Sequence, residues 1–158
     1  MKRARGVGIQ VGVVCLGLAA LAGGCGSGGS TTISSQPLSG KIGGQPWTFM
    51  TGETDSVQLT ANQYSVDAYG ESFTPCTGSA SLTADALFLN FPMAVGNYAV
   101  TLQLNQTFYV AATGDNLIAH SGEIDITDIN ATTITGGANF AFDANNSVDG
   151  QFQATICP

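Results

Sequence analysis

The sequence has few of the residues on which catalytic and metal sites are usually built. It contains one histidine, His120, and only four Lys and Arg residues against eleven Asp and Glu. A zinc site needs several His or Cys ligands, and a serine-based triad needs a base beside its nucleophile. Ser121 follows His120, but consecutive residues of a strand point to opposite faces. We therefore interpret this histidine as an ordinary strand or loop residue.

Other signs of chemistry are missing too. The chain has no G-x-S-x-G elbow, P-loop, dinucleotide-binding fingerprint or C-x-x-C pair, so it predicts no cofactor and argues against an enzyme. Charged residues make up 9% of the chain, well below the usual quarter or so. Such a surface must be solvated by Thr, Ser, Asn and Gln, which favours strands over helices.

The first 24 residues have the layout of a secretory signal. Lys2, Arg3 and Arg5 precede an apolar run at residues 6–22, and small residues then lead to Cys25. The run is shorter than the roughly 20 residues that a membrane-spanning helix needs. The sequence therefore predicts export rather than a membrane span.

Two cleavage sites are compatible with this signal. Residues 20–22 read Ala-Leu-Ala, an A-x-A site whose soluble product would begin at Gly23. The alternative resembles the bacterial lipobox, with Gly23 and Gly24 before Cys25, although Leu21 stands one place earlier than in that pattern. Cleavage there would place a lipid on Cys25. Gly26 in the next position resembles the pattern of outer-membrane lipoproteins.

The number of cysteines favours lipidation. Cys15 lies in the signal, and a soluble product would keep Cys25, Cys76 and Cys157, leaving one thiol unpaired in an oxidising compartment. A lipid on Cys25 would leave Cys76 and Cys157 to form a disulfide. Two free thiols or a metal pair are the alternatives.

Three segments follow from this interpretation. Residues 1–24 are the signal, residues 25–37 are a lipidated cysteine with a flexible Gly/Ser tether, and residues 38–158 are a single β domain. After cleavage only Lys41 would oppose the eleven acidic residues, a formal charge of −10 (1 − 11). Nucleic acid would repel so acidic a chain. The expected partners are the membrane, through the lipid, and an envelope protein or glycan.

Apolar residues alternate with polar ones along most of the chain, which is typical of half-buried strands. The clearest case is residues 121–129, where Ile124 and Ile126 share one face and Glu123 and Asp125 the other. The Gly43-Gly44 pair predicts a hairpin turn. We expect an all-β domain, an antiparallel sandwich or barrel-like fold of about eight to ten short strands. The predicted strands are 38–42, 45–51, 56–61, 63–69, 85–91, 96–103, 106–112, 121–129, 132–143 and 151–157.

The two ends of this domain resemble a known group. The opening "SGKIGGQPWTF" and the close "SVDGQFQATIC" look like those of small bacterial lipoproteins that share G-x-(I/V)-G-G-x-x-W-x-F and V-x-G-x-F-x-x-x-x-C motifs. The resemblance covers most of residues 37–157. It implies a β-rich exported lipoprotein and no known activity.

Acidic residues offer two further candidate sites. Glu123 and Asp125, with Asp128 just beyond, have a spacing that could serve glycoside hydrolysis, but we interpret them as a solvated strand face. In the loop at residues 143–150, Asp143, Asn145, Ser147 and Asp149 present oxygens at alternate positions, which suggests calcium. Val148 stands where an EF-hand requires glycine, so a turn is the preferred interpretation.

Trp47, the single tryptophan, could stack on a sugar ring or, in phase with Phe49, belong to the core. We expect the core. The function that fits best is a lipid-anchored structural or interaction module of the bacterial envelope, at the outer membrane. A β-sandwich that binds carbohydrate or another small ligand is the alternative, and a carboxylate-based hydrolase comes after both.

Overall fold

The computed structural model describes residues 32–54, 62–77 and 84–158. Within these ranges the chain forms eleven strands and no helix. The predicted signal, Cys25 and the predicted strand at 56–61 lie outside the described residues. The strands are β1 (Ser39–Ile42), β2 (Gln45–Thr48), β3 (Thr51–Thr54), β4 (Gln63–Tyr69), β5 (Ala86–Pro92), β6 (Gly96–Ala99), β7 (Thr107–Val110), β8 (Asp115–Ile118), β9 (Ser121–Ile129), β10 (Thr133–Asp143) and β11 (Asn146–Thr155).

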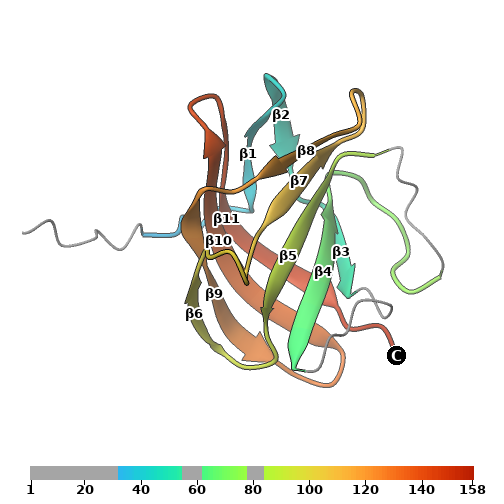
Figure 1. The fold of residues 1–158 in the computed structure, drawn as a ribbon. Helices are drawn as coiled ribbons and strands as arrows, with labels where there is room; N and C mark the ends of the chain where they lie inside the picture. Colours follow the sequence, from blue (N-terminus) through green and yellow to red (C-terminus); the bar gives the residue numbers. More distant parts are fainter. Residues whose placement is uncertain (1–31, 55–61, 78–83) are drawn as a thin grey trace, which may run out of the picture.

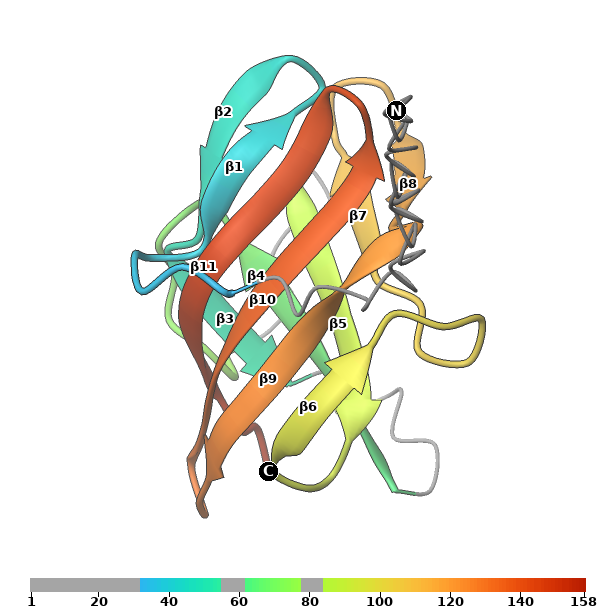
Figure 2. The same ribbon diagram turned by 90° about the vertical axis from the view of Figure 1, so that its left-hand side faces the viewer.

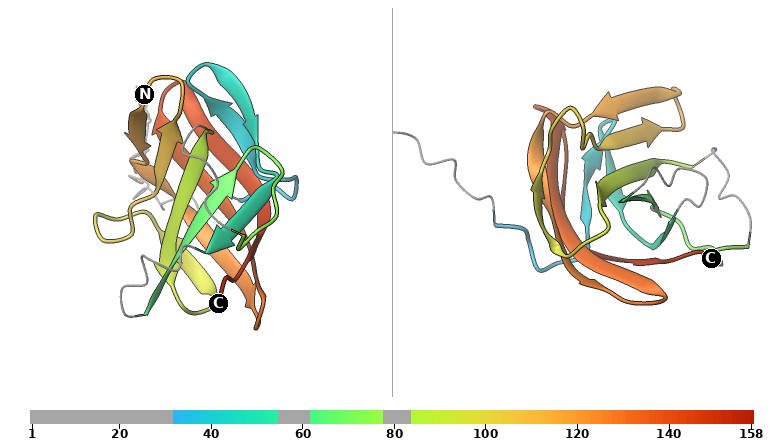
Figure 3. Two further views of the ribbon diagram at one scale, coloured as in Figure 1. Left: turned by 90° about the vertical axis from the view of Figure 1, so that its right-hand side faces the viewer. Right: turned by 60° about the horizontal axis from the view of Figure 1, so that its bottom comes forward.

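All eleven strands belong to one sheet that curls into a half-barrel (Figure 1). The order is β6-β9-β10-β11-β3-β4-β5-β7-β8, and the β1–β2 hairpin joins through the pairing of β1 with β11. Seen from the end, the long strands form one curved wall that faces β4 and β5 (Figure 3). The predicted all-β, barrel-like class is therefore confirmed. The sheet is mixed, because β11 and β3 pair in parallel.

The core follows the alternation that the sequence shows. In β9, Ile124 and Ile126 are each 1% exposed, and the carboxylates that alternate with them, Glu123 and Asp125, lie on the other face of the sheet. In β10 the residues of one parity, Ile134, Ala138, Phe140 and Phe142, are all buried. The inward faces thus fill the half-barrel with aliphatic and aromatic side chains, and their removal from water is the main driving force for folding.

The β1–β2 hairpin turns where the glycine pair predicts. Gly43 and Gly44 have φ angles of 59° and 80°, the conformation of a type I′ turn, which glycine adopts without steric cost. The Gly43 N–H also donates to Asn146 Oδ1 at 2.7 Å. That bond ties this turn to the neighbouring β10–β11 turn.

Two features differ from the sequence-based expectation. The strands β3 and β8 were not predicted as separate elements. The predicted loop at 144–150 is shorter in the structure, since β11 already begins at Asn146. Gly150, with a φ of 138°, is a residue of that strand, and the backbone of Leu38 lies against it.

The folded body begins ahead of residue 38. Residues 32–37 cross the outer face of β11 (Figure 2), where Ser34 N donates to Asp149 Oδ1 and Gln151 Nε2 donates to Ser34 O. Ile33 lies against Gly137 of β10. The last part of the predicted tether is therefore attached to the sheet.

The sheet consists of two sectors that meet at one seam. We call β6, β9, β10 and β11 the C-terminal sector, and β3, β4, β5, β7 and β8 the middle sector. Across the seam the only paired strand residues that the structure describes are Thr155 and Glu53, and Cys157 N donates to Thr54 Oγ1 at 2.8 Å. Within the C-terminal sector, by contrast, β10 and β11 pair along nearly their whole length.

Candidate functional site

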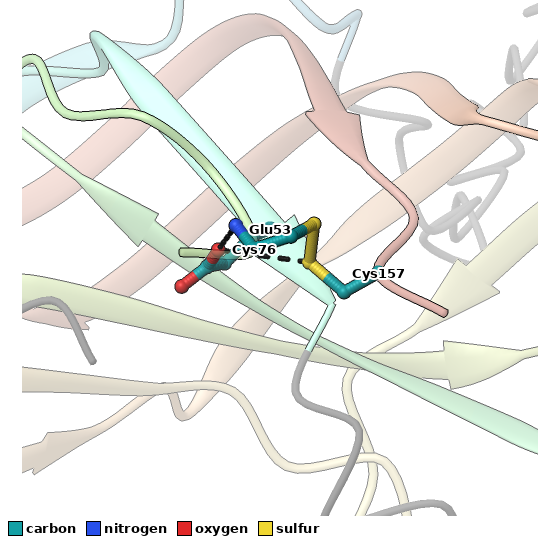
Figure 4. Close-up of side chains that lie close together, drawn as sticks. All are labelled: Glu53, Cys76 and Cys157. Carbon is teal, nitrogen blue, oxygen red and sulfur yellow. Dashed lines mark hydrogen bonds between the residues drawn. A yellow bond between two sulfur atoms is a disulfide. The ribbon is translucent and has the colours of Figure 1, made fainter. Parts of the chain in front are cut away.

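A disulfide closes the seam between the sectors (Figure 4). It joins Cys76, in the segment between β4 and β5, to Cys157 just after β11, with the Cα atoms 5.4 Å apart. These are the two cysteines that the sequence analysis pairs. The bridge spans 81 residues, a loop whose closure lowers the entropy of the unfolded chain enough to stabilise the fold by about 4 kcal/mol.

Glu53 of β3 lies beside this disulfide. Its Oε2 accepts a hydrogen bond from Cys76 N and lies 3.6 Å from Cys157 Sγ. In residues 32–54, 62–77 and 84–158, these three side chains form the one group of three potential metal ligands. Because the sulfurs are bonded to each other, neither offers the thiolate that a metal needs. We interpret the cluster as a structural fastening of the seam.

The candidate hydrolytic carboxylates lie on the outer face of β9. Glu123 and Asp125 are each half-buried and alternate with the inward Ile124 and Ile126. Both stand opposite residues of β6 and β10 in the ladder. Asp128 accepts a hydrogen bond from Asn130 Nδ2. These contacts fit the interpretation of a solvated strand face.

The candidate calcium ligands do not share one loop. Asp143 ends β10, where its carboxylate accepts hydrogen bonds from Asn145 N and Asn146 Nδ2. These bonds, that of Asn145 N first, hold the pKa of Asp143 below its usual value of 3.8. Ser147 and Asp149 belong to β11, and Asp149 accepts from Ser34 N. The carboxylates of Asp143 and Asp149 thus accept hydrogen bonds within the turn and from the strap of residues 32–37, which agrees with the preferred interpretation of a turn.

Trp47 belongs to the core, as expected. It is 6% exposed and packs edge-to-face on Phe108, with ring centroids 5.3 Å apart, while Phe108 packs similarly on Phe142. With so little of its surface exposed, the indole offers no open ring face for a sugar to stack on. Its Nε1–H, however, has no hydrogen-bond partner among the described residues. A buried donor without a partner costs about 1–3 kcal/mol.

A pocket opens beside this indole, with a volume of about 510 Å³. Its lining comes from four places in the chain. Trp47 lies in β2, and Gly70 and Glu71 lie just after β4. Asp85 lies just before β5, and two alanines lie in the β7–β8 turn. The volume lies within the range of about 300–1,000 Å³ that is typical of small-molecule sites. This is the strongest candidate site in the part of the chain that the structure describes.

Trp47 is a candidate from the sequence alone, whereas the two acidic residues that line this pocket, Glu71 and Asp85, are not. Tyr69 and Ala86 are paired in the β4–β5 ladder, so the residues just beyond the strands, Glu71 and Asp85, come to the same end of the sheet. The pairing of the two strands would have been the signal. Asp85 Oδ1 accepts from Ala111 N at 2.8 Å, a bond that fastens the β7–β8 turn to this wall of the pocket.

Comparison with known proteins adds no family to this picture. No protein-family model matches the chain, and no curated protein and no solved structure matches it significantly. Among the described residues, no helix is long and apolar enough to span a membrane.

Proposed function

We propose that the protein is an exported lipoprotein of the bacterial envelope. Its N-terminal lipid is carried by Cys25, and its β domain serves as a structural or interaction module at the outer membrane. The observation that supports this best is the disulfide between Cys76 and Cys157, because stable structural disulfides are typical of oxidising compartments outside the cytoplasm.

The same bridge gives Cys25 its place in the proposal. With Cys76 and Cys157 bonded to each other, a mature chain that begins at Gly23 would carry Cys25 as its one unpaired thiol. An unpaired thiol in an exported protein is open to cross-linking and oxidation. Attachment of the lipid removes that thiol, and it lets several buried acyl chains hold the protein at a bilayer.

The half-barrel suits a module whose role is to hold and present a surface. Its interior is filled by buried aliphatic and aromatic side chains, and its carboxylates at Glu123 and Asp125 lie on the outer face of β9. The acidic surface favours neutral or cationic envelope partners over anionic ones.

The test is to express the full chain in a bacterial host and label the cells with an alkyne analogue of palmitate. Wild-type protein is expected to take up the label and to have an intact mass that starts at Cys25 with acyl groups added. Cys25→Ser is expected to lose the label, and Cys15→Ser, a matched change within the signal, is expected to keep it. An unlabelled product that begins at Gly23 would refute the lipid anchor.

A further inference from the structure

Three side chains at the seam bring potential metal ligands close together (Figure 4). The sulfurs of Cys76 and Cys157 and a carboxylate oxygen of Glu53 all lie within 4.8 Å of one another. Glu53 Oε2 is 3.6 Å from Cys157 Sγ. Two ligands of a tetrahedral zinc ion, with bonds of about 2.0–2.3 Å, lie roughly 3.5–3.8 Å apart. The carboxylate and one sulfur are therefore already at the separation that a shared zinc ion requires.

The two sulfurs would reach that separation once the bridge between them is reduced. Sulfurs that are no longer bonded move apart to van der Waals contact, which is about the distance between two thiolates on one zinc ion. The Cα atoms of the two cysteines are 5.4 Å apart, so rotation of the side chains achieves this change. The backbone does not need to move.

Hydrogen bonds hold the three segments in place independently of the covalent bond. Cys157 N donates to Thr54 Oγ1, next to Glu53, and Cys76 N donates to Glu53 Oε2. Thr155 and Glu53 are paired in the sheet. A carboxylate has about four acceptor positions on its two oxygens, so Glu53 can bind a metal ion while it still accepts from Cys76 N.

The charge and the exposure of the cluster also favour a cation. Cys76 is exposed and the other two residues are half-buried, which gives an ion a path to the ligands. Lys41 is the one Lys or Arg among the described residues, and it lies opposite Ser147, toward the other end of β11 from Cys157. Two thiolates beside a carboxylate thus need a positive charge from outside the chain, and a bound metal ion supplies it.

We infer that the reduced chain binds a zinc ion through Cys76, Cys157 and Glu53. Thiolate ligands favour zinc over magnesium and calcium. Water completes the tetrahedron of three ligands that the described residues offer. In so far as the protein is exported, as proposed above, it is made in a compartment where disulfides are rare and reaches the oxidising one with free thiols. The metal-binding state then precedes the bridge.

The zinc ion and the bridge exclude each other. A disulfide-containing oxidant takes one electron from each thiolate, the bond between the two sulfurs forms, and Zn²⁺ leaves to solvent. The oxidant's own S–S bond breaks, and its two sulfurs take up two protons. A dithiol reductant reverses the exchange. The same side chains therefore fasten the seam through a metal ion before oxidation and through a covalent bond after it.

The test uses the full chain with Cys15→Ser and Cys25→Ser, so that Cys76 and Cys157 are its only cysteines. After reduction by a phosphine without oxygen, it is titrated with Zn²⁺ alone. We expect one ion per chain, a micromolar or lower Kd, and a higher melting temperature. Co²⁺ in place of Zn²⁺ is expected to give the visible absorption of a tetrahedral thiolate site. Oxidised glutathione is expected to release the ion, and the oxidised chain is expected to bind none.

Single substitutions in this background identify the ligands. Glu53→Gln keeps both thiols and an oxygen that can accept from Cys76 N, yet it is expected to weaken zinc binding at least about tenfold. Glu123→Gln removes the same charge from the outer face of β9, and it is expected to leave the affinity unchanged. Cys157→Ser is expected to abolish one-to-one binding.

Three results would overturn the inference. They are the absence of one-to-one zinc binding by the reduced chain, equal affinities of Glu53→Gln and Glu123→Gln, and zinc binding of the same strength after oxidation. A reduced chain that is unfolded without metal is expected to refold on adding zinc, followed by the emission of Trp47, and failure to refold would count equally against it. With Cys15 and Cys25 replaced, the outcome does not depend on the lipid anchor, whose own test fails or succeeds separately.

Discussion

The C-terminal sector and the seam hold their strands together in different ways. In the C-terminal sector, β9, β10 and β11 pair over long antiparallel ladders, and residues 32–37 lie across the outer face of β11. At the seam, β11 meets β3 through the single pair Thr155 and Glu53. There the disulfide, the Glu53 carboxylate and the bond from Cys157 N to Thr54 take over from the ladder.

This contrast shows that two parts of one sheet can be joined with very little backbone pairing between them. A long antiparallel ladder is built from hydrogen bonds that each contribute about 1 kcal/mol net, and it needs no covalent help. A single parallel pair cannot resist opening in the same way. The covalent bridge therefore lies where the ladder is shortest, and each prediction below tests whether the two regions are as unequal as this implies.

The largest effect is expected from removing the bridge. Replacing Cys76 and Cys157 together by serine should lower the free energy of unfolding by about 4 kcal/mol, as measured by urea denaturation. Hydrogen exchange should show the larger loss of protection in β3, at the seam, and the smaller loss in β10. Equal losses in both strands would show that the two sectors open as one unit.

A second prediction concerns the close packing of the C-terminal sector. Gly122 has a φ of 130°, and an added Cβ would lie 1.9 Å from Asn139 O. Gly122→Ala should therefore lower the free energy of unfolding by about 2–3 kcal/mol, through backbone strain and the displaced strand. Gly114→Ala is the control, since Gly114 has a φ of 75° but open space around it, and it should cost about 1 kcal/mol. Equal costs would mean that φ alone matters.

The smallest effect is expected at the β10–β11 turn. The hydrogen bonds from Asn145 N and Asn146 lower the pKa of Asp143 below 3.8, so the charged form is favoured by folding. Its contribution to stability is present above pH 4 and is lost as the pH falls through the folded-state pKa. The stability difference between wild type and Asp143→Asn should therefore shrink between pH 6 and pH 3, measured from urea midpoints. A difference that stays constant would contradict the assignment.

Much of the C-terminal sector could be predicted because its side chains alternate strictly. The strand predicted at 121–129 coincides with β9, and that at 132–143 with β10 to within one residue. When one face of a strand is buried and the other faces water, apolar and polar residues alternate with a period of two along the sequence. The Gly43-Gly44 turn was equally readable, because positive φ at both positions favours glycine.

The strands that were missed lack this signal. In β3 the buried residues are Gly52 and Thr54, neither of which is a hydrophobic marker. In β8 all residues but Leu117 are exposed, so no alternation is visible. The predicted loop at 144–150 was too long because Asn146, Asp149 and Gly150, typical turn residues, here belong to β11.

The pocket was beyond sequence reasoning for a different reason. Glu71 and Asp85 become neighbours of Trp47 only because β4, β5 and the β7–β8 turn end at the same place. That convergence depends on strand order, which a single sequence does not reveal. The missing partner of Trp47 Nε1 among the described residues is also a property of the packing and leaves no trace in the residue pattern.

If Cys25 carries a lipid, the strap of residues 32–37 limits how far the domain can move from the membrane. Ile33 lies against β10 and follows Cys25 by eight residues, which span at most about 29 Å in any conformation. A lipid on Cys25 would thus be joined by a short linker to the β10–β11 face of the domain. The domain would stay close to the bilayer, with that face nearest the lipid. It would therefore contact only partners that lie near the membrane surface.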